Sequence, residues 1–288
     1  MKKLLITTIL IFAGSLLMKA DAMVVMDYQG NTVVNSNGVE RNLLLNSDDG
    51  EICDIALRPL DSALTSTDGR ISIPLDKVYI NNHQEDVYFR YNEYSNLFRR
   101  IRMGGVAKSI VAKVRGYGMV PAGTYNLNFE IQAIDSNTQN IASMSTFMLQ
   151  FVVLPTQEIS FHGEEAAINV SAKDAFAKNK KITTETNPMI YINSNTDWSL
   201  YLNTDKMNET AGNYFIRTVT ASGQVNERLQ DRIELYPNRE ILIAKGKAPS
   251  NNEYVSIELA VEGKDGKYLK AGDYYNNLRF ILREDRGK

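Results

Sequence analysis

A run of strict two-residue alternation is the feature that most limits how this chain can fold. Between Tyr125 and Ala133 every second residue is apolar, and the residues between them are amides or a carboxylate. Successive side chains of a β-strand point to opposite faces, so the pattern predicts a strand with one buried face. A second alternating run, from Phe147 to Val153, follows after a polar connection. Together the two runs predict a hairpin.

The chain also repeats itself. Residues 109–125 read SIVAKVRGYGMVPAGTY and residues 256–274 read SIELAVEGKDGKYLKAGDY, with the shared positions in the same order and at nearly the same spacing. A shorter match, residues 79–81 with residues 191–193, lies upstream of each copy. An internal repeat of this kind indicates two related structural units.

The strand patterns and the repeat predict an all-β fold of two tandem, immunoglobulin-like antiparallel sandwiches. We expect the first domain at 23–155 and the second at 156–288, because the stretch around Pro155 lies between the two copies. Cys53 is the single cysteine, so it has no partner within the chain for a disulfide. Its apolar neighbours indicate a buried small side chain.

Each copy of the repeat ends in Ala-Gly-x-Tyr, which predicts a structural corner. Gly123 and Gly272 allow the backbone angles of a tight turn. Tyr125 and Tyr274 follow them, where a buried ring can return its hydroxyl to the backbone, as tyrosine corners do in immunoglobulin-like sandwiches. Trp198 enters an apolar strand after a polar turn, which favours a core position over a sugar-stacking one.

The first 22 residues read as a secretory signal peptide. Lys2 and Lys3 precede an apolar run from Leu4 to Leu17, and Ala20-Asp21-Ala22 offers a cleavage site. An uncleaved membrane anchor is the alternative, but the apolar run is short for a bilayer core of about 30 Å. We therefore expect export to the periplasm, the cell surface or the medium, and no integral membrane segment after cleavage.

The sequence offers no constellation for catalysis, a cofactor or a transition metal. His83 and His162 have no metal-ligand neighbours, and no nucleophile elbow or phosphate-binding loop is present. The acidic cluster from Asp48 to Asp54 is either a calcium site or a solvated turn. The net charge of −2 argues against nucleic acid as a partner. The basic run Arg99, Arg100 and Arg102 is either a solvated loop or a docking site for an acidic partner.

The C-terminal residues resemble a known family. Ala271-Gly272-Asp273-Tyr274, followed by alternating Leu278, Phe280 and Leu282, is similar to the last strand of secreted fimbrial and spore-coat-U-like proteins. The chain lacks the paired cysteines of the coat-U pattern. The resemblance implies an exported immunoglobulin-like sandwich that assembles by lending a strand from one subunit to the next.

The second copy of the repeat lacks a following strand like the one from Phe147 to Val153, which predicts an unpaired edge along Tyr274, Leu278, Phe280 and Leu282. A donated strand would complete this edge. The mature N-terminus, where Val24, Met26 and Tyr28 alternate without an obvious local partner, is one candidate donor. The alternative is that an earlier segment, Glu158 to Val170, already covers the edge.

We therefore expect a non-enzymatic surface or fimbria-like protein with an adhesive or structural role, and with itself or other surface subunits as partners. Two other classes stay open. One is a periplasmic assembly chaperone or scaffold, which would carry a basic anchor between its domains. The other is a secreted carbohydrate-binding or carbohydrate-active protein, for which a glycan would be the ligand.

Overall fold

The computed structural model describes residues 24–35, 38–47, 52–102, 104, 107–116, 119–162, 168–175, 181–204, 212–263, 268–269, 271–274 and 278–285. The expected signal peptide lies outside these ranges. The described residues are mainly strands, with a short 3-10 turn, η1 (Leu75–Lys77), and one helix, α1 (Ala172–Ala175). No helix among them has the length and apolar character needed to cross a bilayer. The all-β fold class is confirmed.

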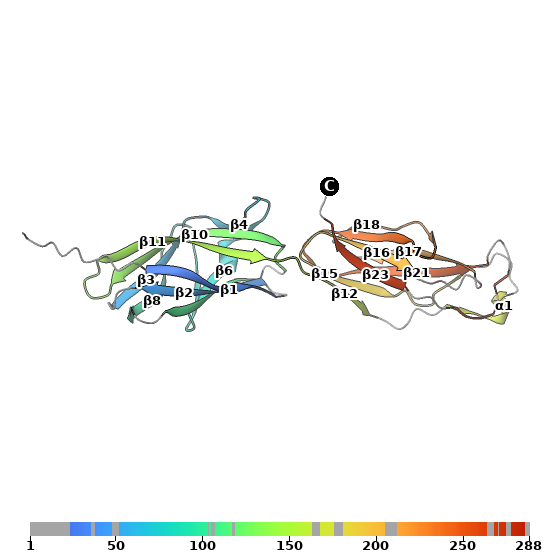
Figure 1. Cartoon of the computed structure of the whole chain (residues 1–288), viewed down its shortest axis with the longest axis horizontal. Coiled ribbons are helices and arrows are strands. Elements are labelled where there is room, and N and C mark those ends of the chain that lie inside the picture. The colour runs from blue at the N-terminus through green and yellow to red at the C-terminus, as the bar shows by residue number, and fades with distance from the viewer. Residues whose placement is uncertain are drawn as a thin grey trace, which may run out of the picture.

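The N-terminal half of the chain forms two facing sheets, here called the first sandwich (Figure 1). One sheet has the strand order β1-β2-β9-β6-β7. The other has the order β5-β4-β10-β3-β8, and β11 pairs with β10. The strands are β1 (Val24–Asn35), β2 (Gly38–Ser47), β3 (Ile52–Pro59), β4 (Ala63–Ser66), β5 (Ser72–Pro74), β6 (Val78–Asn81), β7 (Asp86–Tyr88), β8 (Ser95–Arg102), β9 (Lys108–Arg115), β10 (Gly123–Asp135) and β11 (Ile141–Val153).

The predicted hairpin is confirmed as β10 and β11. The two strands pair antiparallel, with Phe129 opposite Phe147 and Tyr125 opposite Phe151. Every second residue from Tyr125 to Ala133 and from Phe147 to Val153 points into one hydrophobic core, which also contains Cys53 as a buried residue. The period-two pattern thus sets both the face that is buried and the register of the pair.

The N-terminal strand has a local partner. β1 pairs antiparallel with β2, beginning with Val24 opposite Ser47, and Met26 is part of the first core. The expectation that Val24, Met26 and Tyr28 lacked a partner is therefore wrong. The partner strand follows directly in the sequence, with Asn35 opposite Gly38, so the pair is a hairpin.

β1 also closes one side of the first sandwich. It lies beside β11, the edge of the opposite sheet, and side chains join the two strands. The Ser145 hydroxyl donates to the Val24 carbonyl oxygen at 2.7 Å, and the Val152 N–H donates to the Thr32 hydroxyl at 2.9 Å. These bonds satisfy backbone groups that an open edge would leave to water.

The C-terminal half forms the second sandwich around a separate core (Figure 1). One sheet has the order β12-β15-β21-β17-β19, with β14 also paired to β21. The other has the order β18-β20-β16-β23, and β13 pairs with β22. The strands are β12 (Gln157–His162), β13 (Ile168–Val170), β14 (Lys181–Thr183), β15 (Met189–Ser194), β16 (Trp198–Thr204), β17 (Asn213–Ala221), β18 (Val225–Arg228), β19 (Ile233–Leu235), β20 (Glu240–Gly246), β21 (Ser250–Glu262), β22 (Gly272–Tyr274) and β23 (Leu278–Glu284).

A single buried side chain fastens the connection between the two sandwiches. The Asn195 amide oxygen accepts the Thr156 N–H at 2.7 Å, and its amide nitrogen donates to the Leu154 carbonyl oxygen at 2.9 Å. The Asn195 carbonyl oxygen accepts the Ala122 N–H, from the corner before β10, at 2.8 Å. Backbone from both sandwiches is therefore bound to one residue, and the sandwiches lie end to end (Figure 1).

Candidate functional site

The second Ala-Gly-x-Tyr motif lies in β22, and the alternating residues after it lie in β23. In β22, Tyr274 is opposite Ile168 of β13. β23 pairs antiparallel with β16, where Leu282 is opposite Leu200 and Phe280 is opposite Leu202. β22 and β23 therefore each pair with one strand of the second sandwich, β13 and β16.

The other side of this segment differs from its counterpart in the first sandwich. β10 is flanked by β4 and β3 on one side and by β11 on the other. In the second sandwich, β22 pairs with β13 and β23 pairs with β16. Along the described part of the chain, no strand takes the place of β11, so β23 ends its sheet. The predicted edge residues Leu278, Phe280 and Leu282 thus lie on an edge strand.

The apolar side chains of β23 are also less buried than those of β10. In β10, Leu127 and Phe129 are 0 % and 1 % exposed. In β23, Leu278 and Phe280, with Leu282 beyond them, are half-buried and lie at the margin of the second core. Apolar side chains at a sheet edge that a neighbouring strand would bury are a mark of an interaction site.

The strand nearest to this edge belongs to the opposite sheet. β12 pairs with β15, with Glu158 opposite Asn193. Phe161 of β12 is 58 % exposed, and its ring centroid lies 5.7 Å from that of Phe280. Residues 158–170 therefore divide in two with respect to the predicted edge. β13 pairs with β22, where Ile168 lies opposite Tyr274, so that part of the edge has a partner within the chain. β12 pairs with β15 and lies beside β23 without a strand pairing to it in the described structure.

The structure describes the tyrosine side chain of the first corner motif, and only the backbone of the second. Tyr125 is fully buried, and its hydroxyl donates to the Pro121 carbonyl oxygen at 2.8 Å. Gly123 begins β10 with φ +154°, a backbone conformation that L side chains rarely adopt. Gly272 and Tyr274 have a described backbone in β22, while the Tyr274 side chain lies outside the described part.

Trp198 lies at the centre of the second core. Its ring is 0 % exposed, and its indole nitrogen donates to the Ser250 hydroxyl at 2.8 Å. Gly246 faces the ring so closely that a Cβ atom there would lie 2.3 Å from it. The ring therefore fills the sandwich interior and offers no face to a sugar.

Comparisons with known proteins found no matching family model and no similar curated protein. Several solved structures are similar to the chain. The CupB6 tip adhesin from Pseudomonas aeruginosa is 8 % identical, with 93 % of this chain and 95 % of that chain covered, at a TM-score of 0.41. The CsuC-CsuE chaperone–tip adhesion subunit complex from Csu pili of Acinetobacter baumannii is 12 % identical over 89 % and 92 %, at 0.36. The class 5 fimbriae chaperone CfaA is 14 % identical over 91 % and 100 %, at 0.26.

The basic run lies on β8, and part of it has a structural role. The Arg100 N–H donates to an Asp54 carboxylate oxygen at 2.6 Å, and the Ser136 hydroxyl donates to the same oxygen at 2.9 Å. These bonds, the Arg100 N–H first, hold the pKa of Asp54 below its usual value. Arg99 and Arg102 have exposed side chains.

The predicted calcium cluster falls only partly within the structure. Asp48, Asp49 and Glu51 lie outside the described residues, whereas Asp54 binds Arg100 and Ser136 as given above. Among the described residues no three acidic, histidine or cysteine side chains gather closely enough to hold a metal ion.

The sequence analysis named Glu158 to Val170 as a segment that could cover the edge, without distinguishing the residues of β12 that border β23. Ile159 and Phe161 alternate with polar neighbours between Glu158 and His162. This is a short period-two signal, which identifies a strand but not the strand it lies beside.

Proposed function

We propose that this protein is an exported, non-enzymatic, fimbria-like surface subunit whose second sandwich is completed by a strand from another subunit. The observation that carries the proposal is the edge of β23. Its backbone has a partner strand on one side in the described structure, and Leu278, Phe280 and Leu282 are half-buried beside it. The physical consequence is affinity for an extended segment of another chain.

The first sandwich supplies a template for the incoming strand. There β11 binds β10 along its length and buries Phe147, Leu149 and Phe151 in the core. A strand with the same alternation, placed along the edge of β23 that faces away from β16, would form main-chain hydrogen bonds with β23 and cover its apolar residues. Because β1 already pairs with β2, we assign the donor to another subunit and not to residues 24–35 of this chain.

The junction between the sandwiches supports a subunit over an assembly chaperone. A chaperone of this architecture would present a basic anchor between its domains. The residues bonded across the junction are Ala122, Leu154, Thr156 and Asn195, and none of them is charged. The two sandwiches also lie end to end, which favours a rod-like subunit (Figure 1).

A carbohydrate-active enzyme is the third class, and the proposal sets it aside because no motif in the sequence singles out a pair of carboxylates for catalysis. A screen with general glycoside and peptide substrates checks this directly. Turnover by the purified protein, lost on substitution of a carboxylate, would replace the structural assignment.

A self-completed variant tests strand donation. In the chain from residue 23, a copy of residues 141–153 is appended through a short flexible linker after Lys288. This segment has the alternation of β11, and we expect it to pair with β23. The appended strand should raise the unfolding temperature of the second sandwich, measured by calorimetry, and should abolish any concentration-dependent self-association, measured by sedimentation.

The matched control carries the same appended segment with serine at the copies of Phe147, Leu149 and Phe151. This control keeps the length and backbone but removes the apolar side chains that the edge would bury, so it should unfold like the parent chain. Equal unfolding temperatures for the parent, the self-completed variant and the serine control would contradict the proposal.

A further inference from the structure

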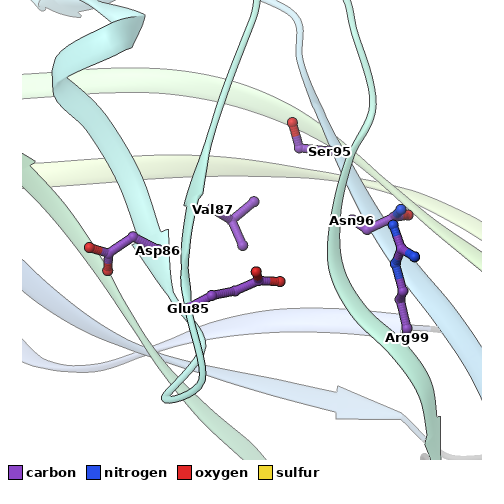
Figure 2. A pocket seen from close by; sticks show the side chains of 6 residues that line it. All are labelled: Glu85, Asp86, Val87, Ser95, Asn96 and Arg99. Atoms are coloured by element: carbon purple, nitrogen blue, oxygen red, sulfur yellow. The ribbon is translucent and has the colours of Figure 1, made fainter.

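A polar pocket opens on the first sandwich, on a different strand pair from the one that β1 and β11 close. β7 ends one sheet and β8 ends the other. Between them is a hollow of about 560 Å³, within the range of about 300–1,000 Å³ typical of small-molecule sites. Figure 2 shows side chains from both strands around it: Glu85, Asp86, Val87, Ser95, Asn96 and Arg99.

The pocket is lined almost entirely by polar groups. Val87, which belongs to the first core, is its one aliphatic side chain. Glu85 projects between the strands, and Arg99 and Asn96 lie on the other strand (Figure 2). In the described part of the chain, no side-chain hydrogen bond or ion pair engages Glu85 or Arg99. One wall thus offers a carboxylate acceptor and the other a guanidinium donor.

The walls are held in place from beneath. Asn82 is buried, and its amide oxygen accepts the N–H groups of Gln84 and Glu85 at 2.9 and 2.8 Å. Its amide nitrogen donates to the Leu97 carbonyl oxygen on β8 at 2.6 Å. One side chain therefore fixes the turn that carries Glu85 to the strand opposite, which sets the width of the pocket before any ligand binds.

The ligand must suit a polar, two-sided lining. An apolar compound would leave the charged groups without partners on desolvation. Sugar hydroxyls both donate and accept, so one ring can donate to Glu85 and accept from Arg99, while the amide of Asn96 does either. A small aliphatic surface such as Val87 suits the C–H groups of the same ring.

We propose that this pocket binds a saccharide of one or two sugar units, with Glu85, Asn96 and Arg99 as the recognition residues. The inference rests on the proposed surface function, for which it supplies a ligand class. It adds a second binding site, on the first sandwich, to the strand-accepting edge of the second.

The test uses an array of printed glycans probed with the self-completed chain, so that the open edge does not contribute. Hits are then titrated by calorimetry with the free oligosaccharide. Glu85→Gln and Arg99→Ala should each weaken binding about tenfold or more, because each removes a hydrogen bond to a charged group. Thermal unfolding should match the parent, since both side chains are exposed.

The controls are Glu93→Gln and Arg90→Ala. They change the same residue types in the segment between β7 and β8, outside the pocket lining, where Arg90 and Glu93 form an exposed pair. Tyr91→Ala tests a neighbouring hollow, which Tyr91 and Asn126 line. All three should bind as the parent does. Loss of binding with Tyr91→Ala, or unchanged binding with Glu85→Gln and Arg99→Ala, would overturn the assignment to this pocket.

An array on which the folded chain binds no glycan would also overturn the saccharide inference. Strand donation would stand independently in that case, because its test measures the unfolding temperature of the second sandwich and not ligand binding.

Discussion

At the scale of single residues, a few buried polar side chains determine how backbone segments meet. Tyr125 binds the Pro121 carbonyl oxygen across its corner, Trp198 binds Ser250 in the second core, and Asn82 joins two sheets beneath the pocket. A buried donor or acceptor without a partner costs about 1–3 kcal/mol. Each of these bonds therefore favours one arrangement of strands over alternatives.

The Tyr125 hydroxyl gives a direct measure of this effect. Tyr125→Phe keeps the buried ring and removes one hydrogen bond, so the free energy of unfolding of the first sandwich should fall by about 0.5–1.5 kcal/mol. Tyr88→Phe is the control, since the Tyr88 side chain is exposed. Urea denaturation followed by fluorescence measures these free energies of unfolding. Equal stability of Tyr125→Phe and the parent would contradict a stabilising hydrogen bond from the Tyr125 hydroxyl at the corner.

Asp54 predicts a pH dependence. Its pKa is lowered in the folded chain, chiefly by the Arg100 N–H and then by the Ser136 hydroxyl. The stabilisation is therefore complete above the unfolded-state pKa of about 3.9 and is lost as the pH falls through the lower folded-state value. Asp54→Ala should be less stable than the parent at pH 7, and the difference should shrink towards pH 3. A difference in urea midpoint that is constant with pH would contradict this.

At the scale of strands, the sequence predicts which face of a strand is buried better than it predicts which strands lie beside it. The alternation from Tyr125 to Ala133 predicts which face of β10 is buried. It also identifies β11 as the partner strand, because the alternating run of β11 follows after a short polar connection. For β23, the alternation of Leu278, Phe280 and Leu282 after the second Ala-Gly-x-Tyr motif predicts the strand and its apolar face. The segment from Glu158 to Val170 was named as a possible cover. Its division into β12, which lies beside β23, and β13, which pairs with β22, depends on contacts between residues far apart in the chain, such as Phe161 and Phe280.

Two other features were beyond the sequence for physical reasons. The sequence does not identify the partner of β1, because polar residues interrupt the alternation after Tyr28. In the structure β1 forms a hairpin with β2, and the register of the pair shifts between Gln29 and Val33. Glu85 and Arg99 carry no motif, because a pocket formed between the ends of two sheets depends on tertiary packing. Among the pocket residues, the sequence analysis singles out Arg99 alone, as part of a basic run.

Matched phenylalanines on β10 and β23 test the difference between the two edges. Phe129 is fully buried, so Phe129→Ala should cost about 3–5 kcal/mol of unfolding free energy. Phe280 is half-buried, so Phe280→Ala should cost less than half as much in the parent chain, and more once the appended strand covers it. Urea denaturation of the parent, the self-completed chain and these three variants checks this, and equal costs at the two positions in the parent would contradict an open edge.

At the scale of the whole molecule, the joint between the sandwiches sets how the strand-accepting edge is presented. Asn195 is fully buried and binds Leu154 and Thr156 through its side chain. A stiff joint suits a subunit that transmits force along an assembly, since both sandwiches then keep one relative orientation. The proposed sugar pocket and the strand-accepting edge belong to different sandwiches, so the joint also lies between the two sites.

Asn195→Ala should loosen this joint. The substitution removes both side-chain bonds, so small-angle X-ray scattering should show a wider range of particle dimensions, and protease should cut faster near residues 154–156. Asn193→Ala is the control, because the Asn193 side chain accepts the Asn252 N–H within the second sandwich. Scattering and cleavage equal to those of the parent would show that Asn195 does not fix the joint.

Hydrogen exchange along β23 tests the central claim most directly. In β10, strands on both sides protect consecutive amides between Phe129 and Ile134. In β23, β16 lies on one side, so residue-resolved exchange should show slow and fast amides in alternation between Leu278 and Glu284. Addition of the appended strand should slow the fast set and leave β10 unchanged. Uniform protection along β23 in the parent chain, equal to that of β10, would show that the edge is already closed and would contradict strand donation.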